Sequence, residues 1–283
     1  MGHIRGIFFE IKMIALDLDG TLLNSKKEVS DKTVEVLQRA AEREIYIVLA
    51  TGRTVWGIQP LLKKLGCVRY AVMANGAIVK DLQTGELIEE HLLPAKQAIE
   101  LYDYVKSKDI MFDFFADGVG YTEQAFYEYV KRVPVDEASR QMLIASRTPI
   151  ISVRNYLSQT GDGVEKVNLL FADLELRKKI WDEMRERPNY TVTSSLAANL
   201  ELNDKYATKG NGLRSLCRYL GIGMEHVMAF GDSYNDMNML EEAGIGVAMG
   251  NASEEIKAAA DVITLSNDED GVADMVIRKL SVM

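Results

Sequence analysis

The chain has 283 residues, 47% of them hydrophobic, and a formal net charge of −9. This length predicts one or two domains with sizeable cores, and an acidic chain without a cluster of Lys and Arg is not expected to bind nucleic acid. Cys67 and Cys217 both lie in apolar stretches, which indicates buried free thiols rather than a disulfide framework and fits a cytoplasmic protein.

Residues 1–12 stand before the first expected strand. Their apolar run is too short and too often interrupted by charge for a signal peptide or a membrane span. We expect an N-terminal extension here, which either reflects an upstream start codon, with Met13 as the natural beginning, or adds an edge strand. No other run approaches the roughly twenty apolar residues that a membrane helix needs, so no membrane partner is expected.

The first expected strand, Met13–Leu16, ends at a pair of aspartates. Asp17 and Asp19 are two positions apart, and residues with this spacing in an extended backbone point to the same side. Two like charges so close are stable as ions only if a cation lies between them or one of them holds a proton. The pair therefore indicates a Mg²⁺ site, a nucleophile with its acid/base partner, or both. A strand that ends in a polar turn is the plain alternative.

Strands and helices alternate after this pair. Ser30 precedes apolar residues at helical spacing and is expected to be an N-cap. The expected elements are a helix over 31–44, a strand over 45–50, a helix over 55–65 and a strand over 70–73. This order, with its short connections, predicts a parallel sheet that is covered on both faces.

The segment over 82–198 has a different pattern, which predicts an inserted α+β domain. It opens on a turn over 83–86 and includes two strands that Asp117 and Gly118 join. The expected elements are helices over 94–109 and 174–186 and strands over 111–116, 119–122, 166–171 and 190–193.

Strand and helix alternate again in the last third of the chain. After an alternating segment over 199–203, the expected elements are helices over 211–220, 253–260 and 271–280 and strands over 227–230, 245–249 and 261–264. Residues 13–81 and 199–283 are together expected to form one doubly wound, Rossmann-like α/β core domain, with 82–198 inserted into it.

Polar motifs follow the apolar runs of this core. They are Thr51-Gly52-Arg53, Lys209-Gly210 and Gly231-Asp232-Ser233-Tyr234-Asn235-Asp236. Taken singly, each is explained by a turn, a surface lysine or a helix cap. Their common placement favours a ligand site instead, because open α/β sheets bind ligands at the carboxyl ends of their strands.

Together with Asp17-Leu18-Asp19-Gly20-Thr21, these motifs form an ordered set that resembles the four motifs of the haloacid dehalogenase superfamily of phosphotransferases. The insert, with Ala74-Asn75-Gly76-Ala77 before it and the segment 265–273 near the end of the chain, is similar to the Cof-type sugar-phosphatase branch. The resemblance covers nearly all of the chain after residue 12. It implies that the insert is a mobile cap over the active site, while a rigid structural lobe is the alternative.

The resemblance and the chemistry of phosphoryl transfer assign roles to the acidic residues. Asp17 would attack phosphorus and form an aspartyl-phosphate. Asp19 would protonate the leaving alkoxide and then deprotonate the hydrolytic water. Mg²⁺ would bind to Asp17, to the backbone carbonyl of Asp19 and to Asp232, with Asp236 as a further ligand that acts directly or through water.

Other motif residues are expected to contact the substrate. The phosphate would be held by Thr51, the Gly52 amide, Lys209 and Asn235. Arg53 and Asn75 would meet the rest of the substrate, unless Arg53 forms a structural ion pair. The resulting expectation is a Mg²⁺-dependent hydrolase of small phosphomonoesters, sugar phosphates first. A phosphomutase of the same superfamily and a receiver-type signalling module are the alternatives, and the sequence indicates no oligomeric state.

Overall fold

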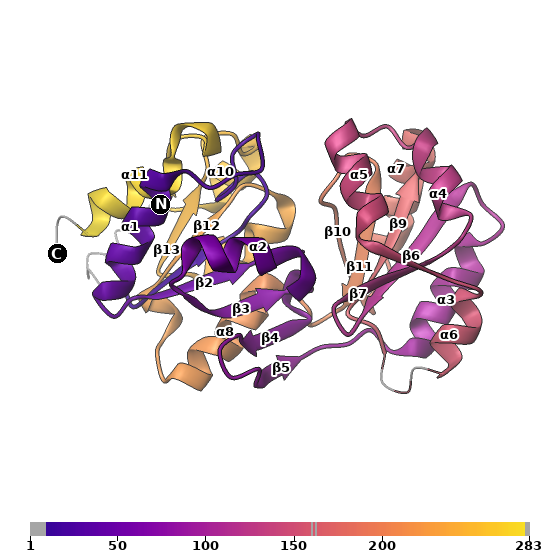
Figure 1. Cartoon of the computed structure of the whole chain (residues 1–283), viewed down its shortest axis with the longest axis horizontal. Helices are drawn as coiled ribbons and strands as arrows, with labels where there is room; N and C mark the ends of the chain where they lie inside the picture. The colour runs from indigo at the N-terminus through magenta and orange to yellow at the C-terminus, as the bar shows by residue number, and fades with distance from the viewer. Residues whose placement is uncertain (1–9, 160, 162, 281–283) are drawn as a thin grey trace.

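Two β-sheets with helices packed against them organise the chain (Figure 1). This architecture comes from a computed structural model that describes residues 10–159, 161 and 163–280. The extension expected over 1–12 therefore lies mostly outside the described residues. Within the described residues, no helix is long and apolar enough to cross a membrane.

The larger sheet has eight strands among the described residues, in the order β14-β13-β12-β1-β2-β3-β4-β5. They are β1 (Met13–Leu16), β2 (Tyr46–Ala50), β3 (Val68–Met73), β4 (Ile78–Asp81), β5 (Leu87–Glu90), β12 (Val227–Gly231), β13 (Ile245–Ala248) and β14 (Val262–Ile263). The strands from β14 to β3 are parallel, and β4 and β5 add an antiparallel edge. Because the strand order runs outward in both directions from β1, the carboxyl end of β1 lies at a topological switch point.

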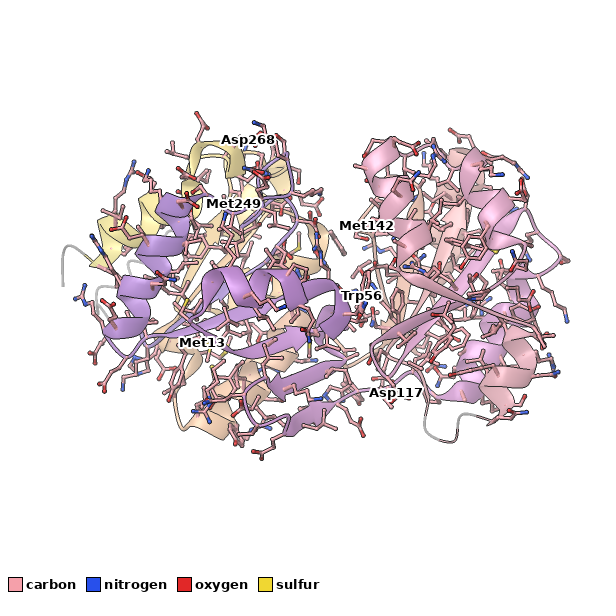
Figure 2. All side chains as sticks on the ribbon, viewed as in Figure 1. Met13, Trp56, Asp117, Met142, Met249 and Asp268 are labelled. Atoms are coloured by element: carbon pink, nitrogen blue, oxygen red, sulfur yellow. The ribbon has the colours of Figure 1, made fainter. Side chains whose placement is uncertain are left out.

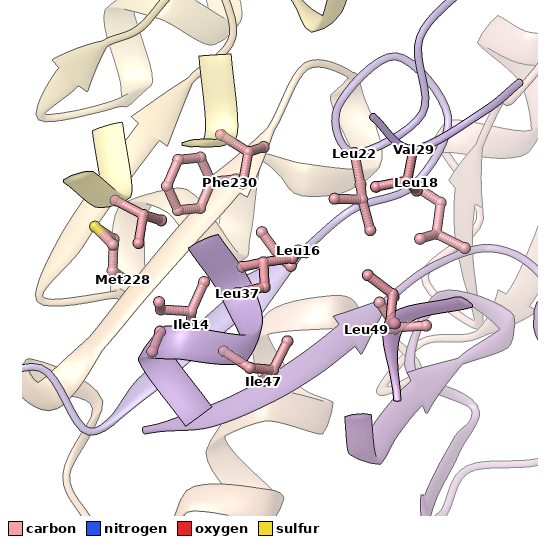
Figure 3. Packing of buried hydrophobic residues seen from close by; sticks show 14 of the residues in the cluster. Ile14, Leu16, Leu18, Leu22, Val29, Leu37, Ile47, Leu49, Met228 and Phe230 are labelled. Atoms are coloured by element: carbon pink, nitrogen blue, oxygen red, sulfur yellow. The ribbon is translucent and has the colours of Figure 1, made fainter. Parts of the chain in front are cut away.

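Helices cover both faces of this sheet, which confirms the doubly wound fold. On one face lie α1 (Asp31–Glu42), α2 (Val55–Leu65) and α11 (Gly271–Leu280), and on the other α8 (Lys209–Leu220), α9 (Met237–Glu242) and α10 (Glu254–Ala259). Successive residues of β1 alternate between the two cores, with Ile14 and Leu16 packing on the α1 side, where Figure 3 shows them near Leu37. Such two-sided burial requires the continuous apolar runs on which the strand predictions depended.

Helix ends follow the local sequence signals. Ser30 accepts a hydrogen bond from the N–H of Thr33 and caps the N-terminus of α1, as its position predicts. Gly66 ends α2 with a left-handed φ of 67°. Short 3-10 turns complete the secondary structure: η1 (Ala74–Gly76), η2 (Val130–Arg132), η3 (Met224–His226), η4 (Tyr234–Asp236) and η5 (Asn267–Glu269).

The smaller sheet has six strands among the described residues, in the order β10-β11-β9-β6-β7-β8. They are β6 (Ile110–Ala116), β7 (Val119–Glu123), β8 (Arg147–Ile150), β9 (Lys166–Phe171), β10 (Tyr190–Thr193) and β11 (Asn199–Asp204). Its helices are α3 (Ala95–Val105), α4 (Phe126–Tyr129), α5 (Glu137–Ala145), α6 (Val153–Gln159) and α7 (Leu174–Arg185). No element was expected between 123 and 165, where the structure forms α4, α5, β8 and α6.

The two faces of the smaller sheet differ in polarity. Helices α3, α6 and α7 pack against an apolar face. The opposite face carries buried polar side chains at alternate positions: Asp113, Lys166, Asn168, Glu201 and Asn203. The β6–β7 turn of the smaller sheet also contacts the core, since Thr54 Oγ1 donates a hydrogen bond of 2.8 Å to the carbonyl of Gly118. Figure 2 shows Asp117 of this turn and Trp56 of α2 at the junction of the two domains.

Strand membership differs from the expected division at both ends. β5 pairs with β4 in the larger sheet, although 82–198 was expected to be the insert. β11 pairs with β9 and β10 in the smaller sheet, although the core was expected to resume at 199. The turn over 83–86 joins two strands of one hairpin, so the chain leaves the core sheet only after β5. We propose that the inserted domain runs from 91 to 204.

Candidate active site

Polar side chains gather at the carboxyl edge of the core sheet. Asp17 follows β1, Thr51 follows β2, Asp232 follows β12, and these three strands are neighbours. Lys209 is the first residue of α8, which Thr208 caps by accepting the N–H of Asn211. The helix begins two residues earlier than expected, and this places the lysine side chain under the strand ends.

Lys209 joins two of the carboxylates in the interior. Its ammonium lies 2.6 Å from Asp17 Oδ1 and 2.6 Å from Asp236 Oδ1, and its side chain is fully buried. Burial alone would lower the pKa of Lys209, but Asp17 and Asp236 raise it above its usual value. Burial raises the pKa of Asp17 well above its ordinary range, with Lys209 opposing and Asp236 adding to the shift. Asp236 repels the Asp17 carboxylate, and the ammonium of Lys209 attracts it. A second cation beside Asp17 would stabilise its ionised form further.

Three carboxylates of this site are close enough to share a metal ion. One oxygen from each of Asp17, Asp232 and Asp236 lies within 4.8 Å of the others. With Lys209 they leave a formal excess of negative charge, and oxygen ligands of this kind are those that Mg²⁺ prefers. Burial and the neighbouring Asp236 raise the pKa of Asp232 to about 6. The donor set therefore fits Mg²⁺.

Neighbouring hydroxyl groups orient Asp232. Thr21 Oγ1 donates to Asp232 Oδ1 at 2.8 Å, and Ser233 Oγ lies 3.1 Å from Oδ2. A Cβ on Gly20, whose φ is +89°, would lie 2.4 Å from Asp232 Oδ2, so this position requires glycine. The sequence analysis gave Thr21 and Ser233 no role, although both lie inside the motifs that it singled out.

Asp236 is held by several donors. Its Oδ2 accepts hydrogen bonds of 3.0 Å from the backbone N–H groups of Asp232 and Ser233, while Oδ1 contacts Lys209. Both oxygens of Asp236 therefore have hydrogen-bond donors within the site.

The side chain of Asp19 points away from the acidic triad. Arg53 holds it with two hydrogen bonds of 2.8 Å, and Lys27 adds a contact of 3.0 Å. Burial would raise the pKa of Asp19, but Arg53 and Lys27 lower it to about 2. Of the two roles expected for Arg53, the structure shows the ion pair. Asp19 is therefore ionised in this arrangement, and it is a weak base as long as Arg53 and Lys27 hold it.

The expected phosphate-binding residues lie on adjoining loops. The Arg53 N–H donates to Thr51 Oγ1 at 3.1 Å, and Asn235 Nδ2 donates to Asn75 Oδ1 at 3.1 Å. Asn75 adopts a left-handed φ of 61° and is almost fully buried. Its amide nitrogen donates to Glu201 of the insert at 2.7 Å, so Asn75 connects the two domains rather than presenting its donor to a substrate.

Magnesium ions should stabilise the protein against heat. A ligand present at about a hundred times its Kd stabilises the native state by about 2.7 kcal/mol, which corresponds to a rise in Tm of roughly 5 °C or more for a chain of this size. Differential scanning fluorimetry with and without Mg²⁺ measures this shift. Asp232→Asn should remove most of it, whereas Asp182→Asn, on the exposed face of α7, should keep it. An equal shift in both variants would exclude Asp232 as a ligand.

A doubly wound sheet that gathers three carboxylates and a buried lysine at its switch point defines an α/β enzyme of phosphate-ester chemistry. Comparison with known proteins agrees. The model of a family described as haloacid dehalogenase-like hydrolase matches residues 14–276. The chain belongs to this family, which confirms the resemblance inferred from its motifs, and it is a phosphatase.

The similarity to individual relatives extends over almost the whole chain. It is 34% identical to Phosphatase YwpJ of Bacillus subtilis, with 94% of this chain and 98% of YwpJ covered. It is 31% identical to 5-amino-6-(5-phospho-D-ribitylamino)uracil phosphatase YcsE of the same bacterium, with 93% and 94% covered. A solved haloacid dehalogenase-like hydrolase from B. subtilis matches with a TM-score of 0.82 at 33% identity, covering 94% of this chain and 99% of that one.

Proposed function

We propose that the protein hydrolyses small phosphomonoesters with Mg²⁺ and through an aspartyl-phosphate on Asp17. The observation that carries this proposal is the buried contact of 2.6 Å between Lys209 and Asp17 beside the acidic triad. Lys209 keeps the nucleophile oriented and places a positive charge where the phosphoryl oxygens accumulate negative charge.

In the first step, an Asp17 oxygen forms a bond to phosphorus while the bond from phosphorus to the leaving oxygen breaks. Mg²⁺, held by Asp17, Asp232 and the carbonyl of Asp19, would offset charge on the transferring group when bound. Thr51, the Gly52 amide and Asn235 would donate hydrogen bonds to the phosphoryl oxygens. In the second step, a water oxygen forms a bond to phosphorus while the bond from phosphorus to the Asp17 oxygen breaks. The water gives a proton to Asp19, and phosphate and the free Asp17 carboxylate are the products.

Asp19 would exchange protons in both steps. Its ion pair with Arg53 favours the ionised form but makes Asp19 a weak base, so accepting a proton from water in the second step requires the contact with Arg53 to loosen. Donating a proton to the leaving alkoxide in the first step requires Asp19 to separate from Arg53. We propose that substrate binding next to Arg53 brings about this separation.

Asp19→Ala should separate substrates by their leaving groups. General acid–base catalysis contributes about 10²–10⁴-fold, and p-nitrophenolate needs little protonation to leave. We therefore expect a large loss of kcat for an alkyl phosphate and a smaller loss for p-nitrophenyl phosphate. The substitution keeps the backbone carbonyl, so the Mg²⁺ concentration for half-maximal activity should stay near the wild-type value. Equal losses for both substrates would instead assign Asp19 to metal binding or folding.

Sugar phosphates are the substrate class that we propose first, with phosphorylated precursors of the kind that the name of YcsE describes as the second. The resemblance to the Cof-type sugar-phosphatase branch supports a hydroxyl-rich leaving group, and such a group needs hydrogen-bonding partners when it leaves water. A phosphate-release screen over sugar phosphates, phosphorylated ribitylaminopyrimidines and pyridoxal phosphate tests this order. Release from none of these esters with Mg²⁺ present would refute the proposed function.

Free Cys67 and Cys217 remain consistent with a cytoplasmic location, which we also propose.

A further inference from the structure

A buried ion pair on the inserted domain lies against the loops of the candidate active site. Lys166 of β9 and Glu201 of β11 are 2.9 Å apart, with side chains only 6% and 5% exposed. Their strands belong to the smaller sheet, but both side chains reach residues of the core. The proposed reaction assigns no role to either residue.

Lys166 contacts the loop that follows β2. Its ammonium donates a hydrogen bond of 2.8 Å to the carbonyl of Gly52. In a trans peptide the N–H points opposite to the carbonyl, and here that N–H belongs to Arg53 and donates to Thr51 Oγ1 at 3.1 Å. Lys166 thus fixes a peptide plane whose other side holds the Thr51 hydroxyl oxygen. Because Thr51 Oγ1 accepts in this contact, its hydroxyl hydrogen remains available to donate to a phosphate oxygen.

Glu201 contacts the second loop of the pocket. Its Oε2 accepts from Asn75 Nδ2 at 2.7 Å, and this nitrogen also donates to Asn203 Oδ1 at 3.1 Å and Thr193 Oγ1 at 3.3 Å. Glu201 provides the shortest of the three contacts that together orient the Asn75 amide. Asn75 Oδ1 consequently faces Asn235 and accepts from its Nδ2 at 3.1 Å. One N–H of Asn235 is used in this way, and the other is left for a phosphate oxygen. Glu201 therefore contributes, with Asn203 and Thr193, to the orientation of Asn235 through Asn75.

Lys166 and Glu201 both have further contacts in the interior. Glu201 Oε1 also accepts from Ser195 Oγ at 2.9 Å, and Lys166 lies 4.9 Å from the centre of the Phe115 ring. Burial would raise the pKa of Glu201, but Lys166 and Asn75 lower it below its usual value, so the carboxylate is ionised. Burying two charges costs desolvation energy that an apolar pair of similar size avoids, so stability alone does not account for these residues.

We propose that Lys166 and Glu201 are positioning residues for the phosphate pocket, acting on Thr51 and Asn235 from the inserted domain. This inference rests on the proposed function, since it assumes that those two residues bind phosphate. It means that the insert supports the chemical step for every substrate, in addition to any part that it has in choosing the leaving group. The expected signature is a loss of activity that does not depend on the leaving group.

Lys166→Met and Glu201→Gln test the proposal, with Arg147→Met as the matched control. Arg147 forms a buried ion pair of 2.9 Å with Asp113 in the same sheet, with side chains 6% and 0% exposed, and neither residue has a hydrogen bond to the core loops. All three variants remove part of a buried polar pair. Only the first two alter contacts with Gly52 or Asn75.

The assays compare p-nitrophenyl phosphate with a sugar phosphate well below the Tm of each variant, together with inhibition by inorganic phosphate. We expect kcat/KM to fall by about tenfold or more for both esters, by the same factor, as is usual when supporting partners of a site are removed. The inhibition constant of phosphate should rise in parallel. Lys166→Arg, which keeps the donor to Gly52, should recover part of the activity. Arg147→Met should lose Tm and keep kcat/KM.

A loss confined to the sugar phosphate would overturn the proposal and make the pair a substrate selector. Losses in Arg147→Met that match those of Lys166→Met would also overturn it and show a purely structural role. Glu201→Gln keeps the size of the side chain and provides the result if Lys166→Met does not fold. Calorimetric binding of inorganic phosphate to the wild type and to Glu201→Gln tests positioning without turnover. This measurement separates failure of the inference from failure of the proposed function, which absence of phosphate release by the wild type would show.

Discussion

Asp17→Asn should abolish phosphate release while leaving the fold intact. The amide keeps the shape of the side chain but cannot supply the anionic oxygen that attacks phosphorus, so we expect kcat to fall by about 10⁴-fold or more, to the background rate. The substitution also removes a buried negative charge that desolvation and the neighbouring Asp236 and Asp232 destabilise. The Tm without Mg²⁺ should therefore equal or exceed that of the wild type.

Release of inorganic phosphate from p-nitrophenyl phosphate and from a sugar phosphate measures the loss, and thermal unfolding without Mg²⁺ monitors the fold. Asp182→Asn makes the same chemical change at an exposed position on α7 and should keep wild-type kinetics. Activity close to that of the wild type in Asp17→Asn would refute the aspartyl-phosphate mechanism, whatever the role of the metal.

Lys209→Met is expected to reduce both stability and activity. Its ammonium is the buried partner of Asp17 and Asp236, and loss of one partner from a buried pair costs about 3–5 kcal/mol. For a chain of this size, that cost lowers Tm by roughly 10 °C. Added Mg²⁺ should restore part of the Tm because a cation again offsets the carboxylates. Phosphate release should stay low because the positive charge beside the phosphoryl group is still missing.

Thermal unfolding at several Mg²⁺ concentrations, followed by phosphate-release assays below Tm, measures both effects. Lys106→Met removes a half-exposed lysine that pairs with Asp103 on the surface, where such pairs contribute about 0–1 kcal/mol. A Tm for Lys209→Met as high as that of Lys106→Met would contradict the proposed part of Lys209 in holding the acidic site together.

The core domain could be predicted because its strands and motifs are recognisable in short stretches of the sequence. Buried parallel strands need continuous apolar runs, so β1, β2 and β12 could be located from the sequence. A polar motif that directly follows such a run lies at the carboxyl edge of the sheet. The same reasoning brought Asp17 and Asp232 together in advance. The orientation of Asp19 was not predictable, because its ion pair with Arg53 depends on the distance between two loops.

The inserted domain was harder to predict for a physical reason. Its sheet pairs strands that are far apart in the chain, and β11 is an alternating strand that either sheet would accept. Lys166 and Glu201 lie in ordinary strands outside any motif, and only the register of β9 and β11 brings them to the active-site loops. As a consequence, deletion of 82–198 would leave β11 without its partners, so an isolated core should be built without 91–204.

Hydrogen-bonding groups form several of the contacts between the two domains. Asn203 Nδ2, for example, donates to the carbonyls of Ala74 and Glu165, one in each domain, at 2.9 Å. When apolar surfaces separate, water meets them at a cost of roughly 25 cal/mol per Å². Polar groups instead exchange protein partners for water at a net cost of only about 1 kcal/mol per hydrogen bond. Water can therefore replace these contacts one at a time, and we expect the two domains to separate gradually when phosphate is released.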